Sequence, residues 1–92
     1  MANYAYIVEC SDGTLYTGYT NNLEKRINAH NSGHGAKYTR PRLPVKLVYF
    51  EEYSDANDAI SREKQIKGYS RSKKNELVKK QNPDFKDFSQ LL

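Results

Sequence analysis

The 92-residue sequence predicts one domain of the α/β (α+β) class, with a three-stranded, mainly antiparallel sheet flanked by about three helices. Two observations lead to this prediction. Strand patterns occupy much of the first half of the chain, where polar and apolar residues alternate or apolar residues follow one another. Helix patterns occur where a capping residue precedes a segment that stops near a glycine or proline. A chain of this length makes one domain with a small core and excludes two full-sized domains.

The two N-terminal strands are predicted to form a β-hairpin, because residues 4–10 and 14–19 flank the turn sequence Ser-Asp-Gly at 11–13. Two loop lengths fit these letters. A two-residue turn would put Tyr16 on the face opposite Tyr6, whereas a three-residue loop with its glycine in a left-handed bulge would put both tyrosines on one face. The sequence permits both, and only the second brings the two phenols together.

A helix, a loop and a strand are expected next. Asn21, with Glu24 three residues on, resembles a capping box that starts a helix running to about Ser32. A basic, glycine-bearing loop is expected over 32–42. The third strand is expected over 45–53, in the centre of the sheet or otherwise well covered, because it contains four consecutive apolar residues.

Two more helices complete the prediction. Ser54 or Asp55 caps a second helix that ends near Gly68, and Ser70 or Ser72 starts a third that runs to about residue 81. The folded domain is therefore expected to occupy residues 1–82. Residues 83–92 would form a tail that is docked through its apolar residues or disordered.

Composition limits the setting and the chemistry. Cys10 is the single cysteine, which excludes an intrachain disulfide and a thiolate metal cluster. The sequence shows neither a signal-peptide pattern nor an apolar run of the ~20 residues that span a membrane. We therefore expect a cytoplasmic protein that does not engage membranes.

The charge is placed unevenly along the chain. Residues 62–80 carry eight basic residues against Glu63 and Glu76, a local net charge of +6, whereas residues 51–58 carry four acids and no base. Such a gradient can steer a polyanion onto one end of the molecule. A basic run is also typical of an ordinary solvated helix face, so this feature alone does not identify a nucleic-acid-binding protein.

Several polar residues lie on predicted apolar faces. On the second helix Glu63 lies within a stripe of alanine and isoleucine, and on the first helix Arg26 and His30 project beside the apolar side. Each has an ordinary structural explanation: Glu63 in a salt bridge with Arg26, His30 as a satisfied buried imidazole, or Arg26 reaching solvent. Together with Tyr6 and Tyr16 they supply the carboxylate, cation, imidazole and phenols that phosphodiester hydrolysis uses.

These residues stand in an order that resembles a known family. Tyr4-Ala5-Tyr6, Tyr16-Thr17-Gly18 and the segment NLEKRINAH at 22–30 resemble the motifs of the GIY-YIG nuclease superfamily, most closely its small, single-domain, uncharacterised (UPF0213-like) branch. The resemblance extends over about residues 4–80. The first motif departs from the family because it lacks the glycine and the central isoleucine, which alters packing more than chemistry because the second tyrosine is kept.

The resemblance implies a metal-dependent endonuclease and assigns catalytic roles. Tyr6 and Tyr16 line the site, and one of them helps to activate the attacking water. Arg26 contacts the scissile phosphate, and His30 hydrogen-bonds a tyrosine hydroxyl or shuttles a proton. Glu63 is the metal ligand and holds one divalent ion, Mg²⁺ or Mn²⁺.

The substrate implied is DNA, with RNA as a second polyanion to test, and branched, nicked, damaged or single-stranded DNA fits better than a duplex read by sequence. Such an enzyme would serve DNA repair or processing, and a protein partner could supply its specificity. The expected nucleic-acid contacts are Lys37, Tyr38, Arg40, Lys64, Lys67, Arg71, Lys73, Lys74 and Asn75. Lys37 or Tyr38 could also complete the catalytic site.

Two other functions fit the sequence. The chain could be a nucleic-acid-binding module with the nuclease fold and little activity, which would keep the basic stretch and lose metal dependence. It could instead be a structural or interaction protein, with the tyrosines as core and the acidic residues 51–58 as a partner surface. A pure binder has no need of Glu63 on an apolar stripe, which favours the enzyme.

Overall fold

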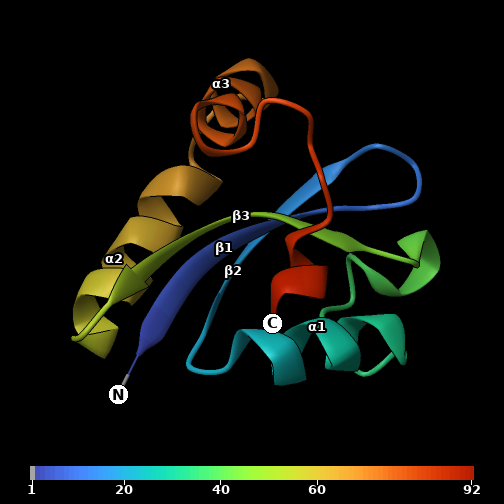
Figure 1. The fold of residues 1–92 in the computed structure, drawn as a ribbon, viewed down its shortest axis with the longest axis horizontal. Coiled ribbons are helices and arrows are strands. Elements are labelled where there is room, and N and C mark those ends of the chain that lie inside the picture. The colour runs from blue at the N-terminus through green and yellow to red at the C-terminus, as the bar shows by residue number, and fades with distance from the viewer. Residues whose placement is uncertain (1) are drawn as a thin grey trace.

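Three strands form one antiparallel sheet in the computed structural model, which describes residues 2–92. The strands are β1 (Asn3–Glu9), β2 (Leu15–Thr20) and β3 (Lys46–Tyr53), and their order in the sheet is β2-β1-β3 (Figure 1). The central strand β1 is buried along nearly its whole length. The predicted fold class, a three-stranded antiparallel sheet with three helices, is confirmed.

The hairpin adopts the longer of the two loops that the sequence permits. Tyr6 pairs with Gly18 and Val8 pairs with Tyr16, so Tyr6 and Tyr16 lie on the same face of the sheet. Gly13 has a φ of +84°, a left-handed conformation that glycine adopts at little cost. This register is what places two phenols beside each other.

Three helices cover the two faces of the sheet. They are α1 (Leu23–Asn31), α2 (Ala56–Lys67) and α3 (Arg71–Gln81), and two short 3₁₀ turns follow α1 and α3, η1 (Arg40–Arg42) and η2 (Phe88–Leu91). In Figure 1 α1 lies on one side of the sheet and α2 on the other, with α3 beyond α2. Within residues 2–92, no helix is long and apolar enough to cross a membrane.

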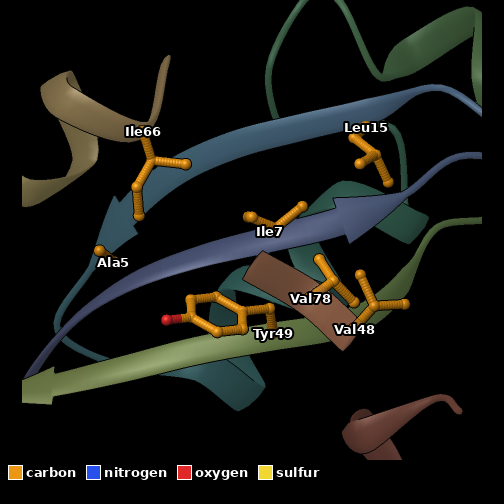
Figure 2. Packing of buried hydrophobic residues seen from close by; sticks show 7 residues of the cluster. All are labelled: Ala5, Ile7, Leu15, Val48, Tyr49, Ile66 and Val78. Carbon is orange, nitrogen blue, oxygen red and sulfur yellow. The ribbon is translucent and has the colours of Figure 1, made fainter. Parts of the chain in front are cut away.

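Each face of the sheet has its own apolar cluster. Ile66 of α2 and Val78 of α3 belong to one cluster with residues of all three strands, and Figure 2 shows Val78 beside Val48 and Ile7. On the opposite face α1 contributes Leu23 and Ile27. The full second cluster is Tyr6, Val8, Cys10, Leu23, Ile27, Val45 and Leu47.

One detail corrects the sequence prediction: the cap of α1 is Asn22, not Asn21, because the Asn22 side chain accepts a hydrogen bond from the backbone N–H of Lys25 at 3.0 Å. Of the two alternatives for the third strand, the structure has the second. The strand lies at an edge of the sheet, and it is well covered on both faces, since Leu47 and Val48 are fully buried.

Side chains from the C-terminal part of the chain close the outer edge of β3. The Gln81 side chain accepts from the backbone N–H of Phe50 and donates to its carbonyl, at 3.1 and 2.8 Å. The Asn82 amide donates to the carbonyl of Val48, and the Asp87 carboxylate accepts from the N–H of Leu47. Side-chain partners thus satisfy backbone groups that an edge strand would otherwise leave open to another chain.

Candidate active site

The centre of the candidate site is the Tyr6 hydroxyl. Tyr6 comes from β1, and its hydroxyl lies 2.8 Å from Nε2 of His30 and accepts a hydrogen bond from Nε of Arg26 at 3.1 Å. Arg26 and His30 are one turn apart on α1, so both project toward the sheet. Tyr6 and His30 are fully buried, whereas Arg26 is half-buried beside a shallow pocket of about 230 Å³.

Gly18 makes room for Tyr6. A Cβ atom on Gly18 would lie 2.4 Å from the Tyr6 hydroxyl oxygen, closer than such atoms approach. The glycine of the second motif is therefore required by the ring that lies across it, not by its own backbone conformation. Because Gly18 has no side chain, the Tyr6 hydroxyl occupies the space that a side chain would fill.

Burial shifts the ionisation of the central groups. It raises the pKa of Tyr6 to about 12, against the favourable hydrogen bond and charge of Arg26. Burial and the Arg26 charge lower the pKa of His30 to about 4, so the imidazole is neutral at pH 7. Burial opposes ionisation of Arg26, but the hydroxyls of Tyr6 and Tyr16 outweigh it and raise the pKa of the guanidinium.

Tyr16 lies beside this cluster on β2 and is half-buried. Its ring meets the His30 ring edge-on, with centroids 5.6 Å apart, and stacks on the ring of Tyr38 at 6.1 Å. Nζ of Lys67 lies 5.7 Å from the centre of the Tyr16 ring. Tyr16 therefore has an imidazole, an aromatic ring and a cation around it.

Glu63 approaches the tyrosines from α2, on the other side of the sheet. Its side chain is nearly buried, and its carboxylate pairs with Nζ of Lys67 at 2.7 Å. The Glu63 charge acts on Tyr6, whose pKa it helps to raise, and Lys67 reaches the ring of Tyr16. Because β2 is an edge strand, side chains of α2 can reach round it, and the site lies at this edge.

Glu63 is the carboxylate among the predicted catalytic residues, and it is the predicted metal ligand. Residues 2–92 contain no group of three or more His, Cys, Asp or Glu side chains that could hold a metal ion. A single carboxylate such as Glu63 is sufficient for Mg²⁺ or Mn²⁺, because such ions commonly keep several waters and use one or two carboxylates plus substrate phosphate oxygens. The donor chemistry of Glu63 is therefore compatible with the predicted ion.

Two residues of the site were missed by sequence reasoning. Thr39 is fully buried, and its hydroxyl lies 2.9 Å from Nδ1 of His30. Gly35 packs against the same imidazole, because a Cβ there would lie 2.4 Å from Nδ1. Both belong to the irregular segment after α1, where no periodicity distinguishes a buried threonine from an exposed one. A single small residue in a loop carries no signal that could have identified it.

The residues expected to contact nucleic acid fall into separate groups. In the loop after α1, Tyr38 is 41% exposed and carries the Arg42 guanidinium over its outer face, 4.0 Å from the ring centre. Asp12 of the hairpin loop holds Arg42 through a 3.0 Å ion pair. Lys37 and Arg40 of the same loop are exposed.

A second group lies where α2 meets α3. Burial first, and then the charges of Lys67 and Arg71, lower the pKa of Lys74, so these three cations lie near one another. Lys73 instead lies over the ring of Tyr69, with Nζ 4.1 Å from its centre. The remaining expected contacts are Lys64, exposed on α2, and Asn75, half-buried on α3.

Comparison with known proteins agrees with this geometry. A model described as the GIY-YIG catalytic domain matches residues 2–76. A UPF0213 protein of Haloquadratum walsbyi is 57% identical over 76 residues, which cover 83% of this chain and 85% of the relative. A UPF0213 protein of Clostridium perfringens is 60% identical over 76 residues, covering 83% of this chain and 82% of the relative.

Solved structures agree as well. The solution NMR structure of a UPF0213 protein from Bacillus halodurans is 42% identical and superposes with a TM-score of 0.63, covering 99% of this chain and 97% of that one. A second NMR structure, from E. faecalis, is 36% identical with a TM-score of 0.59, covering 87% and 85%. The resemblance seen in the sequence is confirmed, and the chain belongs to the GIY-YIG family of nucleases, among the UPF0213 proteins.

Proposed function

We propose that the protein is a divalent-metal-dependent endonuclease that hydrolyses phosphodiester bonds in DNA during repair or processing. The observation that carries this proposal is the hydrogen-bonded group of Arg26, Tyr6 and His30 with Tyr16 beside it. Packing a small core does not require a phenol that is hydrogen-bonded to both a guanidinium and a neutral imidazole. The membership in a nuclease family supports the same chemistry.

Arg26 binds the scissile phosphate. Its Nε donates to the Tyr6 hydroxyl, which fixes the direction of the guanidinium, and Arg26 also lines a pocket beside the site. A guanidinium offers a forked pair of donors that matches two phosphate oxygens. Its charge offsets the negative charge that builds up on the phosphate in the transition state.

Tyr16 is the better placed of the two tyrosines to activate water. Tyr6 is fully buried and burial raises its pKa to about 12, which makes it a poor base. Tyr16 is half-buried, so water can reach its hydroxyl, and Lys67 lies beside its ring. Tyr6 and His30 then serve to hold Arg26 in place.

Glu63 would hold the metal ion, Mg²⁺ or Mn²⁺, and the ion would polarise the phosphate and offset negative charge on the leaving oxygen. Lys67 pairs with Glu63 at 2.7 Å and would add a second positive charge beside that position. Family nucleases use a divalent metal, which supports this assignment.

The substrate proposed is branched, damaged or single-stranded DNA. The exposed basic loop contacts Tyr16 through Tyr38, and the group of Lys67, Arg71 and Lys74 reaches it through Lys67. They supply charge and aromatic area without a helix that enters a major groove. A protein partner could add specificity, and RNA is the second polyanion to test.

The test is a cleavage assay on single-stranded, duplex and branched DNA and on RNA, each with Mg²⁺, Mn²⁺ or EDTA. We expect metal-dependent cutting that Glu63→Gln and Tyr16→Phe each reduce at least 100-fold, on the order of losing a group that acts in the transition state. Tyr19→Phe is the matched control for Tyr16, because Tyr19 lies on the same strand and bonds Asn3 instead. Full activity in EDTA or in Glu63→Gln would remove the metal role.

A second candidate is a nucleic-acid-binding module that keeps the fold and cuts nothing. The basic groups around Tyr16 favour it as the alternative, because they would bind DNA whether or not Glu63 holds a metal. The same assay, read as a gel shift at low and high salt, separates the two. Salt-sensitive binding without cutting in either metal would establish the binding module in place of the nuclease.

A further inference from the structure

Thr39 is buried in a segment that is otherwise exposed. It lies in the loop between α1 and β3, where its neighbours Tyr38 and Arg40 face solvent, yet its own side chain has no exposed area. Its hydroxyl has two partners: the carbonyl of Ala36 at 3.0 Å and Nδ1 of His30 at 2.9 Å. The directions of these two hydrogen bonds can be derived from the chemistry of the groups.

A carbonyl oxygen can only accept, so the Thr39 hydroxyl is the donor in its contact with Ala36. The same carbonyl also accepts from the backbone N–H groups of Thr39 and Arg40, at 3.1 and 3.3 Å, so this contact alone does not fix where the Thr39 hydrogen points. The Tyr6 side of the ring fixes it, because Tyr6 accepts from Arg26 and its own hydrogen has Nε2 of His30 as an acceptor only when that nitrogen is bare. Nδ1 of His30 therefore carries the hydrogen and donates it to Thr39, whose hydroxyl donates to Ala36.

The assignment extends to Tyr6 and Arg26. A neutral imidazole has one N–H, so with Nδ1 protonated, Nε2 is bare and accepts from the Tyr6 hydroxyl at 2.8 Å. The Tyr6 oxygen keeps lone pairs that accept from Nε–H of Arg26 at 3.1 Å. Every donor in this series of hydrogen bonds has an acceptor, and no two hydrogens face each other.

We infer that Thr39 is a positioning residue of the nuclease site: its hydroxyl fixes the His30 proton on Nδ1, which orients the Tyr6 hydroxyl and leaves the Tyr6 oxygen to hold Arg26. The role of Thr39 in cleavage rests on the proposed nuclease function. The proton assignment does not, because it follows from the hydrogen bonds alone.

Gly35 keeps the imidazole in this orientation. A Cβ at Gly35 would lie 2.4 Å from Nδ1 and 2.8 Å from Cα of His30, so the loop backbone lies directly against the ring. The ring of Tyr16 packs edge-on against the imidazole at 5.6 Å. The loop thus supplies both the hydrogen-bond acceptor and the wall that prevents the ring from turning.

The opposite tautomer would disturb Arg26. With the proton on Nε2, both His30 and Arg26 would direct hydrogens at the Tyr6 oxygen, and the Tyr6 hydroxyl would lose its acceptor inside the core. Such a buried donor without a partner is costly. The guanidinium would move by a fraction of an ångström or more, which is enough to misplace a bound phosphate.

The experiment reads the His30 proton directly. Long-range ¹H–¹⁵N NMR spectra of the full chain at pH 7 distinguish the two tautomers, and a His34→Gln background leaves His30 as the single imidazole. We expect Nδ1 protonated with Thr39, and also in Thr39→Ser, which keeps the hydroxyl. In Thr39→Val, which keeps the shape and loses the hydroxyl, we expect the proton to move to Nε2.

Cleavage is measured on the same three proteins. We expect Thr39→Val to lower kcat roughly 10- to 100-fold with little change in KM, the scale of a misplaced catalytic group, and Thr39→Ser to restore it. A protonated Nε2 in the wild type, or an unchanged tautomer in Thr39→Val, would overturn the inference. If Thr39→Val fails to fold, Thr39→Ala, which also lacks the hydroxyl, is measured in its place. The expected tautomers without any cleavage would overturn the proposed function and leave the assignment standing.

Discussion

The Tyr6 hydroxyl is enclosed by an imidazole, a guanidinium and the bare Cα of Gly18. Each neighbour sets a different limit on the residue. The glycine sets the space, the histidine takes the hydroxyl hydrogen, and the arginine uses the oxygen lone pairs. The position of Arg26 therefore depends on Tyr6, whose own position depends on Gly18 and His30.

Gly18→Ala tests the space that Tyr6 needs. The new methyl group would lie 2.4 Å from the Tyr6 oxygen, so the ring must move and its hydrogen bonds to His30 and Arg26 must break. We expect the free energy of unfolding in urea to fall by about 1–3 kcal/mol. Gly68→Ala is the matched control, because its nearest contact would be 3.4 Å, and we expect it to be neutral or stabilising by up to ~1 kcal/mol. Equal effects of the two changes would contradict this account.

His30 predicts a pH dependence of stability. Its pKa is about 4 in the folded protein against ~6.5 in an unfolded chain, so between these values the unfolded state binds the proton and the folded state does not. Lowering the pH therefore favours unfolding, and the free energy of unfolding should fall by about 2 kcal/mol from pH 7.5 to 5.0 on account of His30.

Urea unfolding at the two pH values measures this change. His30→Gln should remove most of the dependence, whereas His34→Gln, at an exposed position near Ser32, should keep it. The same slope in His30→Gln as in the wild type would mean that other groups cause it.

The sequence supplied Tyr6, Tyr16, Arg26 and His30 as a set that the structure does bring together. They could be predicted because strand alternation and helix periodicity fix which way side chains point. Glu63 was placed on an apolar stripe correctly, but its position across a sheet edge depends on tertiary packing that no local pattern encodes.

At the scale of the elements, loop length decides whether the hairpin carries a site. The Gly13 bulge puts Tyr16 opposite Val8 and on the face of Tyr6. A loop one residue shorter would turn Tyr16 to the other face. Both loops suit the same letters, so the choice is made by the core: the register that is found buries Leu15 opposite the face that carries the phenols.

The start of α1 gives a test of capping. Asn22 accepts from the N–H of Lys25, whereas Asn21 is exposed and makes no cap. We expect Asn22→Ala to lower the free energy of unfolding by about 1 kcal/mol and Asn21→Ala to change it by less than ~0.5 kcal/mol. The reverse order in urea unfolding would restore Asn21 as the cap. Two adjacent asparagines are equivalent cap formers, which is why the sequence alone could not choose between them.

At the scale of the whole molecule, the segment that matches the catalytic-domain model is shorter than the segment whose side chains complete the sheet. The family model ends at residue 76, yet the outer edge of β3 is bonded by Gln81, Asn82 and Asp87. Phe88 adds an edge-on ring contact to Phe50 of β3, with centroids 6.1 Å apart. Sequence patterns in the last ten residues did not decide between a docked and a disordered tail, because apolar residues such as Phe85, Phe88 and Leu91 fit either.

Removal of residues 83–92 tests this division. The shortened chain would lose the contact of Phe88 with Phe50 and the hydrogen bond that the Leu47 N–H donates to Asp87. It would therefore expose part of the β3 edge. We expect a lower free energy of unfolding by about 2–4 kcal/mol, as for the loss of a buried aromatic side chain and a hydrogen bond. Light scattering should also show self-association. A matched variant, Gln90→Ala at an exposed position, should change neither.

The side-chain bonds that close β3 also set a sequence of events in time. The ribosome makes the strand by residue 53, but Asp87 is added 34 residues later. Because Gln81, Asn82 and Asp87 lie so near the end of this sequence, their bonds to β3 form only after almost all of these residues have left the ribosome. Until then the β3 edge of a new chain can pair with a neighbouring chain.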